Sequence, residues 1–99
     1  MVKRKIKWTK NSEIQLQQIL EFYIRRNKSS AYSKKLYGKI QHLKKVASNP
    51  EIGIKTKLDA IRGIIVENYI VFYEILNDKI IVLKIWDSRQ NPKKLDIPK

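Results

Sequence analysis

A set of cations in the second half of the sequence is the clearest candidate for chemistry. Its members are Lys55, Lys57, Arg62, Lys84, Arg89, Lys93 and Lys94. Lysine carries a compact point charge, whereas the planar guanidinium of arginine offers a fixed fork of donors that matches a phosphate or a carboxylate. Lys55 and Lys57 are two residues apart, so in an extended segment both would face the same side. The set predicts a surface that contacts phosphates or carboxylates.

Arg89 differs from the other cations because it follows a long strand-forming run, in the segment "IWDSRQNPKKL". Pro92 ends strand pairing shortly after it, because proline has no backbone donor. An arginine at a strand end is exposed and yet anchored by the strand. Two interpretations of Arg89 stay open: a functional cation, or the partner of a structural ion pair with Asp87 or Glu74.

Two aromatic residues, Trp86 and Tyr69, lie close to these cations in the sequence. An aromatic ring beside a cation can stack a nucleobase, but aromatic residues are also common in ordinary strand positions. For Tyr73 we favour the ordinary strand position. Both interpretations of Trp86 stay open.

Composition disfavours several other kinds of site. The chain has no cysteine, which excludes disulfides and cysteine-based zinc sites. The single histidine, His42, lies off the apolar stripe of its predicted helix, so we expect a solvated position. The three glycines are isolated, and the nine acidic residues are scattered instead of clustered as a Mg²⁺ site requires. We expect no metal site and no cofactor.

Length and charge bound the fold and the partners. At 99 residues the chain predicts one domain, residues 1–99, and its 42% hydrophobic content is sufficient for an ordered core. A net charge of +13 attracts nucleic acid, ribosomes, an anionic membrane or an acidic protein partner. The basic start "MVKRKIKW" lacks the apolar run of a signal peptide, and no apolar segment reaches 18 residues. We therefore expect a cytoplasmic protein without a membrane partner.

The first half of the chain predicts a strand and two helices. Apolar and basic residues alternate from Val2 to Trp8, which is typical of a half-exposed strand whose lysines protect a sheet edge. A helix is predicted from about Asn11 to Asn27, with Ser12 and Gln15 spaced as a capping box. A second helix, with an apolar stripe from Tyr32 to Ala47, is predicted to end before Asn49-Pro50 and to pack against the first as an antiparallel hairpin.

After Pro50 the sequence favours strands. Three runs are rich in β-branched and aromatic residues: residues 64–66, 69–75 and 80–86. Short links at residues 67–68 and 77–78 predict an antiparallel meander. Residues 58–62 fit either the start of the first of these strands or a short helical turn. The predicted fold is α+β, with an N-terminal edge strand, an antiparallel helical hairpin and a three-stranded antiparallel meander.

Four segments of the sequence carry a family resemblance. "KIKWTKNSEIQLQQILEFYIRRN" has a strand followed by a Trp-Thr helix start, and "IQHLKKVASNPEIG" ends a helix with Asn49, Pro50 and Gly53. "IRGIIVENYIVFYEI" has an arginine-led strand and a Tyr-x-x-x-Tyr strand, and "IIVLKIWDSRQNPKKL" ends in W-D-x-R-Q-N-P. Each motif is weak alone, but together and in this order they resemble the RelE/ParE superfamily of toxins over nearly the whole chain.

The resemblance implies the toxin of a bacterial type II toxin–antitoxin system, bound by a small acidic antitoxin in a hetero-oligomer. Two mechanisms occur on this fold. RelE-like members cut mRNA in the ribosome, and ParE-like members inhibit DNA gyrase without known nuclease chemistry. RNA cleavage requires a base, an acid and cations for the charged phosphorane.

Two departures from the RelE pattern favour the ParE-like branch. RelE-like toxins often carry an arginine directly after the first tyrosine of the Tyr-led strand, where this chain has Ile70. They also commonly place a tyrosine or a histidine near the C-terminus, and "QNPKKLDIPK" has neither. A gyrase-binding toxin is therefore the first hypothesis, an mRNA endoribonuclease the second, and a degenerate toxin that binds only its antitoxin the third.

The two mechanisms assign different roles to the candidate residues. For the gyrase-binding toxin, the expected target contacts are Arg62, Trp86, Arg89, Asn91, Lys93 and Lys94. For the nuclease, the residues expected around the phosphate are Lys55, Lys57, Arg62 and Arg89.

Overall fold

Helices and strands occupy separate parts of the chain in the computed structural model, which describes residues 4–41, 43–58 and 60–89. In chain order the elements are β1 (Lys5–Trp8), α1 (Lys10–Asn27), α2 (Ala31–Ile40), α3 (Leu43–Ser48), the short 3-10 helix η1 (Pro50–Ile52), β2 (Ile54–Lys55), β3 (Ile61–Val66), β4 (Tyr69–Ile75) and β5 (Lys79–Asp87). The expected solvated position of His42 lies outside the described residues.

The strands form one sheet in the order β1-β5-β4-β3-β2. Strands β3, β4 and β5 make the predicted antiparallel meander. β1 lies at one edge, as predicted, and pairs in parallel with β5 from Lys5 opposite Lys79 to Trp8 opposite Val82. The two-residue strand β2 at the other edge pairs antiparallel with β3 and was not predicted. The α+β class and its order of elements are confirmed.

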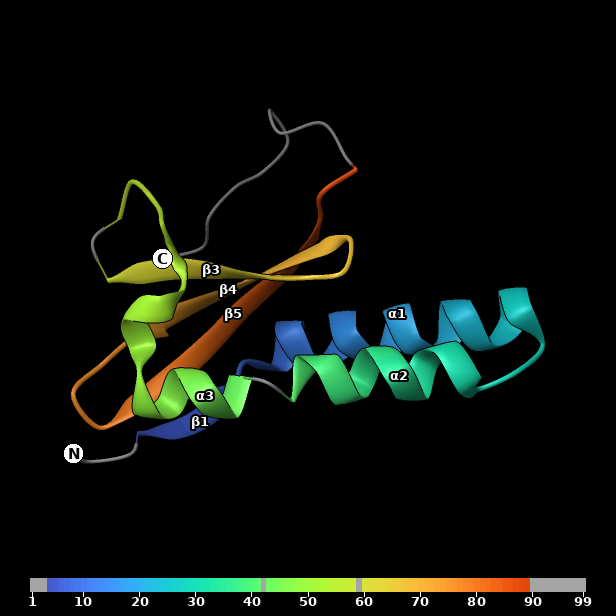
Figure 1. The fold of residues 1–99 in the computed structure, drawn as a ribbon, viewed down its shortest axis with the longest axis horizontal. Coiled ribbons are helices and arrows are strands. Elements are labelled where there is room, and N and C mark those ends of the chain that lie inside the picture. The colour runs from blue at the N-terminus through green and yellow to red at the C-terminus, as the bar shows by residue number, and fades with distance from the viewer. Residues whose placement is uncertain (1–3, 42, 59, 90–99) are drawn as a thin grey trace.

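The helices cover one face of the sheet. Figure 1 shows α1 and α2 side by side as the predicted antiparallel hairpin, with α3 beneath the strands beside β1. Their apolar stripes meet the inward residues of the strands, which removes apolar surface from water and stabilises the fold. The buried residues of this core are Tyr23, Leu36, Ile40, Leu43, Val46, Val66, Tyr69, Val71, Tyr73, Ile80, Val82 and Ile85.

A β-bulge in β5 decides which residues of that strand face the helices. Lys84 lies opposite Phe72 and Val82 lies opposite Tyr73, so Leu83 is an extra residue on β5. A bulge of this kind changes the phase of the alternation between the two faces. Val82 and Ile85 therefore both join the core beneath the helices, although they are three residues apart.

The start of α1 differs from the prediction. The N-cap is Thr9, whose hydroxyl accepts a hydrogen bond from the Ser12 backbone N–H at 3.1 Å. The Ser12 hydroxyl is buried and lies 3.0 Å from the Val82 carbonyl oxygen, and the Gln15 side-chain oxygen accepts from the Ile85 N–H at 2.9 Å. The predicted capping box of Ser12 and Gln15 is therefore wrong, because both side chains bond the backbone of β5.

The predicted second helix is two helices in the structure. α2 ends at Ile40 and α3 begins at Leu43, with no glycine or proline between them to mark the break. α3 then runs along β1, where the Ala47 carbonyl accepts a hydrogen bond from the Arg4 N–H at 3.0 Å. Of the two alternatives for residues 58–62, the structure shows strand from Ile61 onward.

The sheet face away from the helices carries a smaller apolar cluster. Ile61, Phe72 and Trp86 are buried there, and Leu83 and Ile70 pack against them. Among the described residues, no helix combines the length and the apolar character that crossing a bilayer requires.

Candidate functional site

Arg89 lies two residues beyond β5 and is held by Asp87. Its Nε and Nη2 donate to the two carboxylate oxygens of Asp87 at 3.0 and 2.9 Å, and its backbone N–H donates to Asp87 Oδ1 at 2.9 Å. Of the two ion pairs considered from the sequence, the structure forms the one with Asp87. The side chain of Arg89 remains 54% exposed. The strand end therefore presents a guanidinium in a fixed orientation, with part of its surface open to solvent.

A group of tyrosines supports this strand end from the side of α1. The Tyr69 hydroxyl donates to the Tyr23 hydroxyl at 3.2 Å, and the ring of Tyr23 lies 4.6 Å from that of Tyr32. Burial, and next the hydrogen bond to Tyr23, raise the pKa of Tyr69 above its ordinary value of 10.0. The hydrogen bond to Asp87 contributes most to raising the pKa of Arg89, and the hydrogen bond to the Tyr23 hydroxyl contributes next. Arg89 is thus always charged, and Tyr69 stays protonated at neutral pH.

The pair of Asp87 and Arg89 makes a pH-dependent contribution that can be measured. The hydrogen bond from Arg89 holds the pKa of the Asp87 carboxyl below its ordinary value of 3.8. A carboxyl with a lowered pKa stabilises the fold above its ordinary pKa, and the contribution is lost as the pH falls through the folded value. In a ¹³C NMR titration we expect the Asp87 midpoint below 3.8 in the natural protein and closer to 3.8 in Arg89→Ala.

Arg25→Ala is the matched control for that titration, because it removes another exposed arginine that pairs with a different carboxylate, Glu21. It should leave the Asp87 midpoint unchanged. An Asp87 midpoint that is the same in Arg89→Ala and in the natural protein would show that the pair does not form in solution.

Arg62 is occupied by the backbone at the opposite end of the strands. Its Nη1 donates to the carbonyls of Gly53 at 3.0 Å and of Glu51 at 3.3 Å, and its Nε is buried. Lys55 lies opposite Arg62 in the β2–β3 ladder, and both Lys55 and Lys57 are exposed. The structure thus brings Lys55 and Arg62 together, and Arg62 fastens the segment that leads into β2.

The register separates these cations from Arg89. Arg62 is level with Tyr73 and Val82, whereas Asp87 is level with Tyr69 and so with Val66, four residues further along β3. At about 3.3 Å per residue, that separation is about 13 Å along the strands. Arg62 and Arg89 do not converge on one point in this structure.

The remaining predicted site residues fall in two groups. Trp86 is buried in the apolar cluster with Ile61 and Phe72, and the Lys84 ammonium lies 5.3 Å from the centre of its ring. Its ordinary sheet interpretation therefore fits the structure better than an open stacking platform. Asn91, Lys93 and Lys94 lie outside the described residues.

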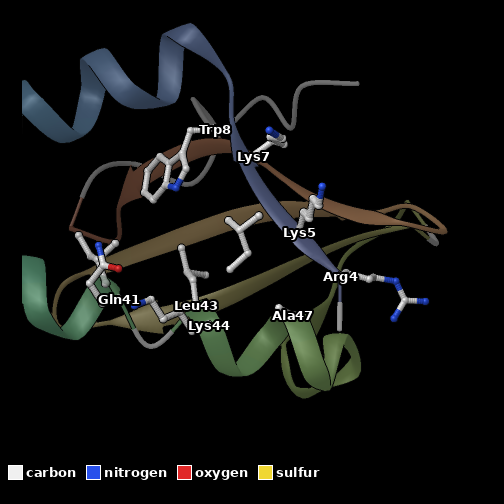
Figure 2. Close-up of a pocket in the computed structure, with 10 residues that line it drawn as sticks. Arg4, Lys5, Lys7, Trp8, Gln41, Leu43, Lys44 and Ala47 are labelled. Carbon is white, nitrogen blue, oxygen red and sulfur yellow. The ribbon is translucent and has the colours of Figure 1, made fainter. Parts of the chain in front are cut away.

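A groove between β1 and α3 was missed in the sequence. Figure 2 shows Trp8 on one side of it and Leu43 and Lys44 on the other. Its volume is about 640 Å³, and Ile6, Ile40 and Ala47 complete its apolar lining. At one end β1 and α3 are joined by the hydrogen bond from Arg4 to Ala47. We call this feature the β1–α3 groove.

The backbone of β1 is open toward this groove. The N–H groups of Lys5 and Thr9 donate to Asp78 and Val82, so the odd-numbered residues of β1 bond β5. The alternation of a strand then directs the N–H and C=O of Ile6 away from β5 and into the groove. No described residue pairs with them. The signal in the sequence was the alternation of Lys5 and Lys7 with apolar residues, which predicted the edge strand but not the α3 side of the groove.

Comparison with known proteins agrees with the sheet and its covering helices. The family model described as ParE toxin of type II toxin-antitoxin system, parDE, matches residues 6–92. A solved structure, described as "Chromosomal ParDE TA system from P. aeruginosa", is 18% identical with a TM-score of 0.68, and the match covers 85% of this chain and 95% of that one. No curated protein matches. The structural match supports the fold, and the family model matches most of the sequence. The chain belongs to the ParE toxin family of type II toxin–antitoxin systems.

Proposed function

We propose that the protein inhibits growth by binding DNA gyrase and that it does not cut RNA. The supporting observation is that the cations expected around a phosphate do not all converge: Arg62, beside Lys55, bonds backbone carbonyls, and Arg89 pairs with Asp87 at the other end of the strands. Tyr73, which pairs with Arg62 across the sheet, is fully buried and its hydroxyl accepts from the Gly53 N–H at 3.1 Å. Burial raises its pKa. Tyr73 is therefore not placed to act as an acid or a base on a bound nucleic acid.

Two assays on the purified protein test this proposal. Added to DNA gyrase and relaxed plasmid, the toxin should stop negative supercoiling. Added to ribosomes programmed with mRNA, it should leave the message intact. Cut mRNA with normal supercoiling would overturn the proposal in favour of the endoribonuclease, and no effect in either assay would favour a degenerate toxin.

Arg89→Ala sharpens the gyrase assay, because Arg89 is the exposed member of the predicted target contacts in the described part of the chain. We expect the variant to fold and to inhibit supercoiling more weakly. Lys34→Ala, which removes an exposed cation of α2, is the control and should inhibit normally. Equal inhibition by Arg89→Ala and the natural protein would remove Arg89 from the contact surface.

The antitoxin that such a system requires should bind in the β1–α3 groove. An extended segment paired with Ile6 would place alternate side chains on the two faces of the sheet. Those on one face would meet Ile6 and Trp8, and those on the other would lie beside Lys5 and Lys7, which are exposed. Cross-strand neighbours of opposite charge stabilise a pair of strands. The groove therefore favours a strand in which apolar and acidic residues alternate, as an acidic antitoxin would supply.

A further inference from the structure

We propose a second docking site for an extended acidic peptide, in the notch between α1 and the last residues of β5. This notch is separate from the β1–α3 groove and does not depend on the identity of the toxin's target. Its volume is about 390 Å³, and α1 contributes Gln18, Ile19 and Phe22 to its walls. The opposite wall is β5 from Lys84 to Asp87, together with Arg89.

The notch exists because β1 covers only the first part of the outer edge of β5. Pairing between the two strands ends with Trp8 opposite Val82, and the chain then turns into α1 at Lys10. β5 continues to Asp87 with β4 on its other side. The outer edge of β5 beyond Val82 is therefore left without a neighbouring strand in the described part of the chain.

Backbone groups on this edge are directed into the notch. The Ile85 N–H points away from β4, because it donates to the side chain of Gln15 at 2.9 Å. The Ser88 N–H points toward β4 and donates to Asn68. By this alternation the Ile85 carbonyl and the Asp87 N–H also point away from β4. Within the described residues neither has a partner, so a carbonyl and an N–H are available for an added strand.

An aromatic side chain and a line of cations show what kind of peptide would fit. Phe22 is 51% exposed although it is a large apolar residue, and it stands beside the open edge. A second hollow shares Phe22 and Gln18 with the notch and continues along α1 to Arg25 and Arg26. An apolar or aromatic residue of the peptide would cover Phe22, and acidic residues would face the arginines of α1.

The charge balance of the two hollows favours an acidic occupant. Four cations and two carboxylates line them. The cations are Lys84, Arg89, Arg25 and Arg26, and the carboxylates are Asp87 and Glu21. Asp87 pairs with Arg89 and Glu21 with Arg25, and the two hollows keep a surplus of two positive charges. The whole chain carries +13, which strengthens the attraction for an acidic segment.

The test is an NMR titration of the whole protein with the acetylated and amidated peptide EVEWEVE. The amide signals of Asp87 and Gln18 should shift with a common midpoint. The same titration of Lys5→Glu/Lys7→Glu, which reverses the charge beside the β1–α3 groove, should still shift them. No shift at Asp87 would overturn the proposal, and so would a shift that disappears when the groove is altered.

Phe22→Ala should raise the midpoint at Asp87 about tenfold, because a central aromatic contact carries much of the affinity of an interface. Tyr37→Ala is the matched control: Tyr37 is a comparably exposed aromatic residue, 46%, on α2. It should change the midpoint less than twofold. Equal effects of the two substitutions, or no effect of Phe22→Ala, would contradict the placement of the peptide against α1. None of these outcomes depends on gyrase or on an antitoxin.

Discussion

Replacing Gly53 with alanine is expected to destabilise the protein by about 1–3 kcal/mol, the usual cost of overpacking a closed site. A Cβ at this position would lie 2.2 Å from the Tyr73 hydroxyl oxygen and 3.0 Å from the Gly63 carbonyl oxygen. The first neighbour is a fully buried side chain and the second is backbone, so neither can move aside cheaply. The hydrogen bond from the Gly53 N–H to Tyr73 would also be strained.

The reason is space and not backbone conformation. Gly53 has φ −75° and ψ 162°, which any residue adopts. The substitution would push away the segment that Arg62 holds through the Gly53 carbonyl, so β2 should loosen as well. Urea denaturation followed by circular dichroism would measure the change as a lower midpoint with an unchanged slope.

Gly38→Ala is the matched control for Gly53→Ala. Gly38 lies in α2, and a Cβ there would meet nothing within 4 Å. Alanine in a helix is better than glycine by about 0.5–1 kcal/mol, so this variant should be more stable than the natural protein. If both substitutions shift the midpoint in the same direction, the close approach of Gly53 to Tyr73 is not present in solution.

Periodicity and composition predicted most of the fold. The alternation from Val2 to Trp8 identified an edge strand with Lys5 and Lys7 outward, and the structure has both lysines exposed. The apolar stripes gave a helical hairpin, and the β-branched runs gave the meander. These patterns are reliable because each follows from the period of a helix or of a strand and from the burial of one face.

The features that the sequence did not reveal depend on contacts between distant segments. The capping box failed because Ser12 and Gln15 bond the backbone of β5, about 70 residues away. The bulge at Leu83 and the two-residue strand β2 likewise arise from pairing, which leaves no local pattern. The exposed edge of β5 likewise depends on the register between β1 and β5, which the sequence does not show.

The candidate site was predicted in part. Arg89 was expected at the end of the last strand with Asp87 as one of two structural partners, and that geometry is present. Residue types alone did not show that Arg62 bonds the carbonyls of Gly53 and Glu51. Residue types do not show the partner of a cation when that partner is a backbone carbonyl. The same limit applies to the β1–α3 groove, since α3 and β1 meet only in the folded chain.

Reversing the charge of Lys5 and Lys7 is expected to weaken binding of the antitoxin about 10- to 100-fold. Two unit charges 4 Å apart in water interact by about 1 kcal/mol, and reversing one of them turns attraction into repulsion of similar size. Two such changes, each weakened by salt screening, correspond to the expected loss of antitoxin binding of about 10- to 100-fold. Both lysines are exposed, and Lys5 lies opposite Lys79, so glutamate at position 5 should not disturb folding.

The measurement is a titration of Lys5→Glu/Lys7→Glu with the acidic antitoxin that we expect the adjacent reading frame to encode. Lys34→Glu/Lys35→Glu is the control, because it lowers the net charge of +13 by the same four units on the exposed side of α2. The control should bind less than threefold more weakly, and higher salt should reduce the difference between the variants. An equal loss of affinity in the two double variants would mean that antitoxin binding depends on the total charge and not on the lysines of β1. Normal binding by Lys5→Glu/Lys7→Glu would place the antitoxin elsewhere, because a strand paired with Ile6 must bring its outer side chains beside these two lysines.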